Sequence, residues 1–94
     1  MNAPRVSLEL PSAVREAASL PVPLELAARD VAGLLAALAQ LAPHAGRMVC
    51  DERGRLRPHL ALFVNEEVRR GADALATPLQ AGDRITILPA VSGG

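Results

Sequence analysis

Apolar and polar residues alternate in two short segments near the start of the chain. Residues 6–10 alternate strictly, which predicts a half-buried strand that Pro11 ends. Residues 22–26 alternate in the same way and include Pro23, which suits an edge strand because proline cannot donate to a sheet ladder. The segment between them, 12–19, fits either a helical turn or a loop.

One longer helical pattern follows these strands. Asp30 is a good N-cap for a helix over 31–42, and Pro43 and Gly46 are expected to end it. Its opposite face is mostly alanine and carries no charge. Because alanine is the best helix former, we interpret that face as plain surface rather than a docking site. The apolar residues that fall on one face are Val31, Leu34, Leu35, Leu38 and Leu41.

The second half of the chain returns to strand-like patterns. Residues 48–58 predict a small hairpin or loop that turns at 51–54. Residues 59–65 predict a third strand, and a tight turn leads to a short fourth strand around Val68.

The last strand and the element order together predict the fold class. After a turn at Gly82, the isoleucines of segment 85–88 are expected to point inward, and Thr86 and Leu88 outward. The order is β-β-α-β-β, and one main helix can cover only one face of a mixed sheet of four to five strands. We therefore predict a two-layer α+β domain in which a right-handed crossover places the last strand beside the first.

Composition narrows the classes of function. The 94 residues, half of them apolar, predict one globular domain with a core of aliphatic side chains, since Phe63 is the only aromatic residue. Ten arginines balance ten acidic residues, so no basic surface for nucleic acid is expected. The sequence contains no lysine and hence no side-chain amine. The longest apolar run, 31–43, is too short for a membrane span of about 20 residues. No signal peptide is recognised, and a cytoplasmic location is expected.

Few side chains suggest metal or thiol chemistry. Cys50 is the single cysteine, which excludes an internal disulfide and a cysteine metal cluster. We interpret it as an ordinary intracellular cysteine rather than a catalytic thiol. His44 and His59 lack the spacing of a metal-binding motif, and we interpret them as loop or strand-edge residues. No metal site and no bound cofactor are predicted.

The C-terminal sequence carries a family resemblance. "GDRITILPAVSGG" resembles the ends of the small sulfur carriers of the ThiS/MoaD family, which have the ubiquitin-like β-grasp fold. That family includes the molybdopterin synthase small subunit, the thiamine sulfur carrier and a carrier used in one route to cysteine. "GRLRPHLALFVNEEVR" is similar to the middle of these carriers, the cysteine-type ones in particular. The resemblance spans Val6 to Gly94, and it implies a ubiquitin-like β-grasp domain over 1–94.

The resemblance also implies a chemistry for the chain end. A ubiquitin-activating-type enzyme uses ATP to adenylate the carboxylate of Gly94, and a sulfur donor converts it to a thiocarboxylate. Gly93 and Gly94 have no side chain to obstruct a narrow channel in the partner. Pro89 lacks an N–H and is expected to stop the sheet ladder, which leaves 89–94 as a flexible tail. The tail residues expected to contact partners are Pro89, Ala90, Val91 and Ser92.

The resemblance places two apolar residues on the outside of the sheet. Phe63 and Leu88 are at outward-facing positions of ubiquitin-like proteins, where they would form a patch for the activating enzyme or the acceptor. Phe63, as the only aromatic residue, is equally consistent with an anchor in the core. Arg69 and Arg70 are interpreted as solvated, with a polar rim of the patch as the alternative.

Three functions fit these observations. The first is a sulfur carrier that acts as a co-substrate and is not itself an enzyme. The second is a ubiquitin-like modifier joined to lysines of target proteins, and the third is an interaction module that never carries sulfur. For a carrier, the tail fits cysteine or molybdopterin synthesis better than thiamine synthesis. The expected acceptor is then a cysteine-synthase-like enzyme or the molybdopterin synthase large subunit.

Overall fold

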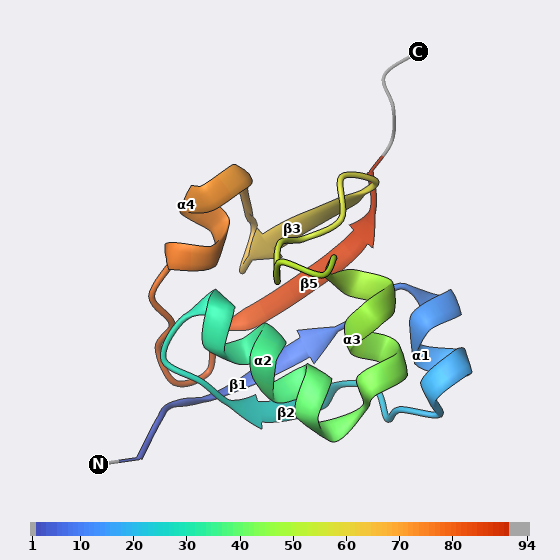
Figure 1. The fold of residues 1–94 in the computed structure, drawn as a ribbon. Coiled ribbons are helices and arrows are strands. Elements are labelled where there is room, and N and C mark those ends of the chain that lie inside the picture. Colours follow the sequence, from blue (N-terminus) through green and yellow to red (C-terminus); the bar gives the residue numbers. More distant parts are fainter. Residues whose placement is uncertain (1, 91–94) are drawn as a thin grey trace.

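A five-stranded mixed sheet with helices packed over one of its faces forms the protein (Figure 1). The computed structural model describes residues 2–90 of the 94-residue chain. In chain order the elements are β1 (Arg5–Glu9), α1 (Ser12–Ala18), β2 (Leu24–Ala27), α2 (Val31–Leu41), α3 (Pro43–Val49), β3 (Leu60–Val64), β4 (Glu67–Arg69), α4 (Gly71–Ala76) and β5 (Arg84–Pro89).

The last strand lies in the middle of the sheet. The strand order is β2-β1-β5-β3-β4, and β5 runs parallel to β1 and antiparallel to β3. A parallel pair needs a crossover connection, and α2 and α3 lie within the segment that connects β1 to β5. The prediction that the last strand lies beside the first is confirmed, as is the α+β class with a mixed sheet.

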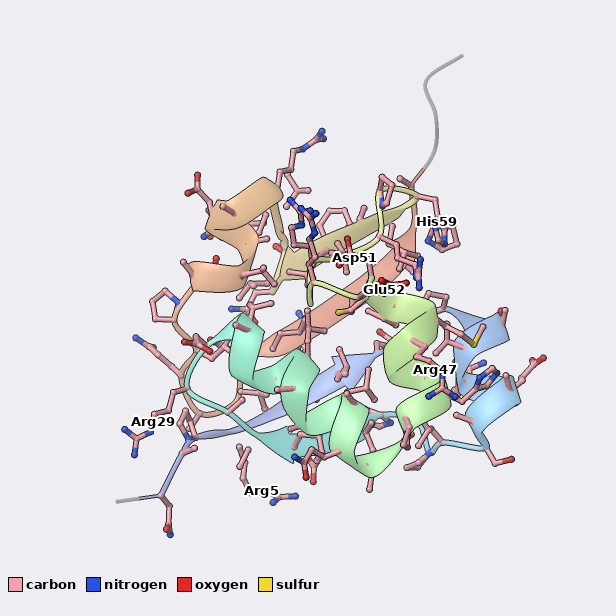
Figure 2. All side chains as sticks on the ribbon, viewed as in Figure 1. Arg5, Arg29, Arg47, Asp51, Glu52 and His59 are labelled. Carbon is pink, nitrogen blue, oxygen red and sulfur yellow. The ribbon has the colours of Figure 1, made fainter. Side chains whose placement is uncertain are left out.

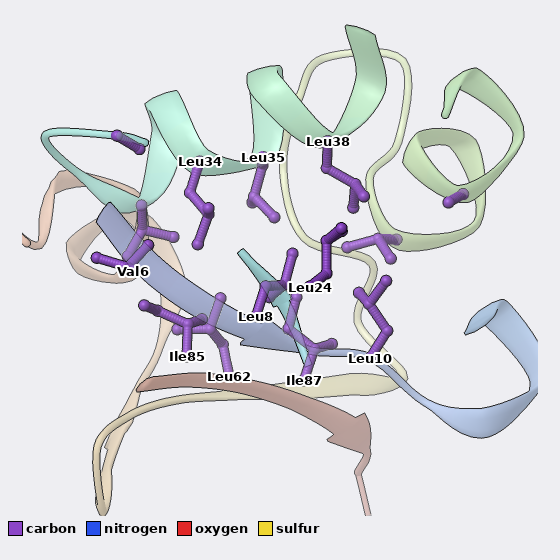
Figure 3. Packing of buried hydrophobic residues seen from close by; sticks show 14 of the residues in the cluster. Val6, Leu8, Leu10, Leu24, Leu34, Leu35, Leu38, Leu62, Ile85 and Ile87 are labelled. Carbon is purple, nitrogen blue, oxygen red and sulfur yellow. The ribbon is translucent and has the colours of Figure 1, made fainter. Parts of the chain in front are cut away.

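The core lies between the inner face of the sheet and α2 (Figure 3). Asp30 caps α2 as predicted, because its Oδ1 accepts a hydrogen bond of 2.7 Å from the backbone N–H of Gly33. Leu41 was expected on the buried face but is 55% exposed. It lies in the last turn of α2, beyond which Ala45 and Val49 of α3 cover the core instead. The most deeply buried side chains include Val6, Leu8, Val31, Leu34, Leu38, Leu62, Ile85 and Ile87.

Pro43 and Gly46 do not simply end the helical segment, and the prediction from sequence is wrong here. Pro43 begins the helix α3, and Gly46 is buried inside it. Proline is favoured at the first position of a helix, where its missing N–H is not needed. A Cβ atom at Gly46 would lie 2.8 Å from the Cα and Cβ atoms of Ala39, so this glycine lets α3 approach α2 closely. The helix α4 was also not predicted.

Other local predictions hold with adjusted boundaries. Segment 12–19, left open as a turn or loop, contains the helix α1. The edge strand β2 begins at Leu24 and leaves Val22 exposed before it. The predicted loop after α3 turns at 51–54, where the Asp51 carboxylate accepts backbone hydrogen bonds from Arg53 and Arg55.

Among residues 2–90, the helices pack on the inner face of the sheet and leave its outer face uncovered (Figure 1). Phe63 pairs with Thr86 of β5 and Val68 of β4, and its neighbour Leu62 points into the core with no exposed surface. Successive side chains of a strand point to opposite faces. Phe63 therefore lies half-buried on the outer face, and of the two possibilities left open by the sequence, the anchor in the core is wrong.

Adjacent alanine substitutions test this assignment. Leu62→Ala should lower the free energy of unfolding by about 2–5 kcal/mol, as expected for a fully buried leucine. Phe63→Ala should cost no more than about 1–2 kcal/mol, because only part of its side chain leaves water on folding. Denaturant unfolding of both variants measures the difference. If Phe63→Ala lowers the free energy of unfolding as much as Leu62→Ala or more, Phe63 is part of the core.

Candidate functional site

The candidate site begins where β5 delivers the chain to the end of the sheet. Ile85 and Ile87 have no exposed surface, and they hold β5 between β1 and β3. The backbone N–H of Ala90 donates a hydrogen bond of 2.7 Å to the carbonyl of His59, the residue just before β3. Figure 2 shows His59 at the end of the sheet where β5 finishes. The position of the chain is therefore fixed through Ala90.

Pro89 does not stop the ladder, contrary to the expectation from sequence. It lies within β5 and pairs in register with Leu60, and the next residue, Ala90, still bonds to the β3 side. Alternate residues of a strand direct their N–H groups to the same side. Since Ala90 faces β3, Pro89 faces the side of β1, where strand pairing has already ended at Glu9. No partner there needs the N–H that proline lacks, so Pro89 is tolerated.

The remaining predicted site residues, Val91, Ser92, Gly93 and Gly94, lie outside the described residues. Their expected contacts with partners and the flexible tail remain predictions. Covalent geometry alone limits the four residues after Ala90 to a span of at most about 14 Å. Any protein that binds Gly94 in an active site must therefore reach close to the end of β5.

An apolar patch lies on the outer face of the sheet. We call it the open-face patch, and it consists of Ala61, Phe63, Val68 and Leu88. Leu88 is 45% exposed and pairs with Ala61, while Val68 pairs with Phe63. The structure thus brings together Phe63 and Leu88, the two residues that the resemblance placed outward. Val68 and Ala61 also belong to the patch because the strand register places them beside Phe63 and Leu88, which the sequence alone did not indicate.

A groove borders the end of β5 at the edge of β3. It has a volume of about 530 Å³ and lies between segment 55–58 and α4, with Ala90 among its lining residues. Figure 1 shows α4 and this segment near β3. The groove was not predicted from the sequence, because the helix α4 was not predicted, although the arginines at 53–57 and 69–70 were a visible signal. We call it the arginine groove, after Arg55, Arg57, Arg69 and Arg70.

Cys50 is half-buried at the end of α3. Burial raises the pKa of its thiol, and the negative charge of Asp51 raises it further. The positive charge of Arg57 has a smaller effect in the opposite direction. The thiol is therefore protonated at neutral pH, which does not favour a nucleophile.

His44 lies on the exposed surface of α3 rather than in a loop. Hydrogen bonds from the backbone N–H groups of Arg55 and Arg53 lower the pKa of Asp51, because they favour its ionised carboxylate.

Residues 2–90 hold no group of three histidine, cysteine or acidic side chains that could bind a metal ion. Within the same range, none of the helices is long and apolar enough to span a membrane.

Comparisons with known proteins agree with this architecture. The model of the ThiS family matches residues 9–94. A putative sulfur carrier protein of Archaeoglobus fulgidus is 34% identical over 61 residues, which cover 65% of this chain and 69% of that protein. The sulfur carrier protein CysO of Mycobacterium tuberculosis is 46% identical over 41 residues, 44% of each chain.

Solved structures extend the similarity to nearly the whole chain. The crystal structure of M. tuberculosis CysO has a TM-score of 0.81 and 25% identity, over 92% of this chain and 99% of that one. Small archaeal modifier protein 1 of Methanosarcina acetivorans has a TM-score of 0.78 and 31% identity, over 100% and 99% of the two chains. The BexX/CysO complex of Amycolatopsis orientalis matches with a TM-score of 0.80 and 25% identity, over 95% and 99%.

The β-grasp sheet, the central last strand and the family match up to Gly94 lead to one assignment. The chain belongs to the ThiS family of ubiquitin-like sulfur carrier proteins.

Proposed function

We propose that this chain carries sulfur on its C-terminal carboxylate and is a co-substrate of partner enzymes rather than an enzyme. The observation that carries the proposal is the family match, which runs through Gly93 and Gly94. The geometry supports it, because a buried central strand leads directly to those residues.

The proposed chemistry starts from an unreactive group. A C-terminal carboxyl has a pKa of about 3.5, so at neutral pH it is an anion and a poor electrophile. A partner enzyme of the ubiquitin-activating type transfers AMP from ATP to the carboxylate of Gly94 and releases pyrophosphate. A sulfur donor equivalent to hydrosulfide then attacks the acyl carbon and displaces AMP. The product is a thiocarboxylate whose sulfur is the nucleophile in the acceptor enzyme.

The two surfaces next to the chain end suit such a partner. The short reach beyond Ala90 requires the partner to contact the protein close by, and the open-face patch includes Leu88 of β5, two residues before Ala90. We assign Phe63 and Leu88 to contacts with the activating enzyme or the acceptor. The BexX/CysO complex is a precedent for a relative that assembles with another protein.

The acceptor is proposed by resemblance. The middle of the sequence resembles cysteine-type carriers, and two kinds of comparison find CysO proteins. We therefore favour a cysteine-synthase-like enzyme as the acceptor over the molybdopterin synthase large subunit. We place the protein in the cytoplasm, where ATP is available to the activating enzyme.

Intact mass measures the proposed reaction directly. After incubation with its adenylating enzyme, ATP and sulfide, the purified protein should gain the mass difference between one sulfur and one oxygen. Fragmentation should locate the gain at Gly94, and omission of ATP is the control. Unchanged mass under conditions that charge an established carrier would exclude the carrier function.

A single methyl group tests the need for glycine at the chain end. Gly94→Ala places a methyl next to the reacting carbonyl, and a displacement of about 1 Å at a reacting centre can cost roughly 100-fold in rate. Thiocarboxylate formation should fall by about that factor. The melting temperature should not change, because the described core lies upstream, between Val6 and Ile87.

The matched control adds the same methyl elsewhere. Gly33→Ala lies on the exposed side of α2, and its Cβ would approach Asp30 Oδ1 at 3.1 Å. This variant should be charged at the normal rate. Normal charging of Gly94→Ala would mean that the terminal glycine is not required.

The second candidate function is a protein modifier, and the similarity to small archaeal modifier proteins favours it as the alternative. It needs the same adenylation of Gly94 but transfers the chain to lysines of other proteins. Because this sequence contains no lysine, it offers no side-chain amine for isopeptide bonds between its own copies.

We predict that the protein never forms self-linked polymers through isopeptide bonds. The test is incubation with ATP, the activating enzyme and cell extract, followed by mass spectrometry of the higher-mass species. Single copies on lysines of other proteins would support the modifier function. A ladder of copies linked through their own side chains would contradict the prediction.

A further inference from the structure

The arginine groove lies directly beside the residues that lead to the C-terminus. β4 pairs with β3 only over Leu62–Val64, so it leaves the earlier part of β3 uncovered on that side. The chain then turns at Gly71 into α4, which forms one wall, and segment 55–58 forms the other. The apolar lining comes from Leu56, Pro58, Leu60, Ala61, Val68, Ala72, Ala74, Leu75 and Ala90.

The charge around this apolar lining has one sign. Four of the ten arginines of the chain line the groove, and none of the acidic residues in the described part, 2–90, does. The chain as a whole has no net charge, so this concentration of positive charge is a local feature. A groove with an apolar floor and guanidinium groups at its sides is complementary to a segment that carries carboxylates around an apolar side chain.

Contacts within the protein leave these charges largely available. Arg55 lies 3.9 Å from the carboxylate of Asp51, a long ion pair, and Arg69 lies 3.1 Å from Glu67, which is 74% exposed. Arg57 uses its Nε to donate to the carbonyl of Arg47. Within residues 2–90, no ion pair or hydrogen bond engages the side chain of Arg70.

We propose that the arginine groove binds an acidic segment of the partner protein that takes up the C-terminal residues. This inference rests on the proposed function, because it needs a partner that holds Gly94. Since the chain spans at most about 14 Å beyond Ala90, such a partner must cover the surface at the end of β5. The groove includes Ala90 and is therefore part of that surface.

Arginine suits this role for physical reasons. Its planar guanidinium forms paired hydrogen bonds with a carboxylate and keeps its charge at any physiological pH. Complementary charge also raises the rate of encounter between proteins and orients them before contact. The groove would align the partner so that the chain end enters its active site.

Titration with a defined peptide tests the inference. The probe is acetyl-Glu-Leu-Glu-Glu-Leu-Glu-amide, added to the ¹⁵N-labelled full-length protein, and the control peptide has glutamine at each glutamate. The acidic peptide should shift amide signals of groove residues in a saturable way and bind at least tenfold more tightly than the control. Binding should be lost at about 1 M salt, where the screening length is about 3 Å.

Variants locate the binding site. Arg70→Ala should weaken binding of the acidic peptide several-fold, and the double variant Arg57→Ala/Arg70→Ala should weaken it at least tenfold. Arg84→Ala is the matched control, because Arg84 is exposed at the start of β5 and does not line the groove. It should bind like the wild type. Thermal melts show whether loss of the Arg57–Arg47 hydrogen bond affects folding, and Arg70→Ala keeps the test valid if it does.

Three outcomes would overturn the inference. The first is equal binding of the glutamine peptide, and the second is signal changes centred on Phe63 and Leu88, the two residues of the open-face patch that do not line the groove. The third is stronger saturable shifts of the same groove residues by ATP or inorganic phosphate, which would make the groove a site for small anions.

The activating enzyme separates this inference from the proposed function. If the wild type is charged with sulfur, Arg70→Ala should raise the KM for the carrier several-fold and leave kcat unchanged. Wild-type kinetics in both arginine variants would refute the groove while the carrier function stands. A wild type that is never charged would refute the carrier function, and with it the partner assigned to the groove.

Discussion

The rest of the structure depends on the pairing of β5 with both of its neighbours. Without it, the sheet would divide into two antiparallel pairs, β1 with β2 and β3 with β4, which no other strand of residues 2–90 connects. The isoleucines Ile85 and Ile87 place this strand at the centre of the core. Chain termini usually fray, but here β5 is paired on both sides as far as Thr86 and bonded to the β3 side as far as Ala90. The chain end therefore starts from a rigid base.

The two faces of the sheet differ in their contribution to stability and in their exposure. The helices cover the inner face, where aliphatic side chains supply the hydrophobic stabilisation of the fold. The outer face carries the only aromatic residue, Phe63, where it is only half-buried and contributes less to stability. An aromatic side chain kept on a partly exposed surface is typical of protein interfaces. This separation allows the outer face to contact a partner without any rearrangement of the core.

The exclusive use of arginine has a chemical consequence in the proposed function. An acyl-adenylate is an electrophile, and a lysine amine near it would compete with the sulfur donor for the acyl carbon. Arginine is a stronger base than lysine and stays protonated, so it pairs with carboxylates without acting as a nucleophile. The arginine groove can thus lie close to the activated chain end without being modified by it. The thiol of Cys50 could also attack an acyl-adenylate, but it is half-buried and protonated.

Local patterns in the sequence determined most strands, the long helix with its Asp30 cap, and the inward isoleucines, because alternation and capping depend on neighbouring residues. The C-terminal Gly-Gly pointed to the family for the same local reason. Tertiary structure alone decided that Gly46 of α3 packs against Ala39 of α2, that Pro89 stays in the sheet, and that α4 completes the groove. Each of these depends on which other segment lies opposite in the fold, and residue spacing along the chain does not encode that.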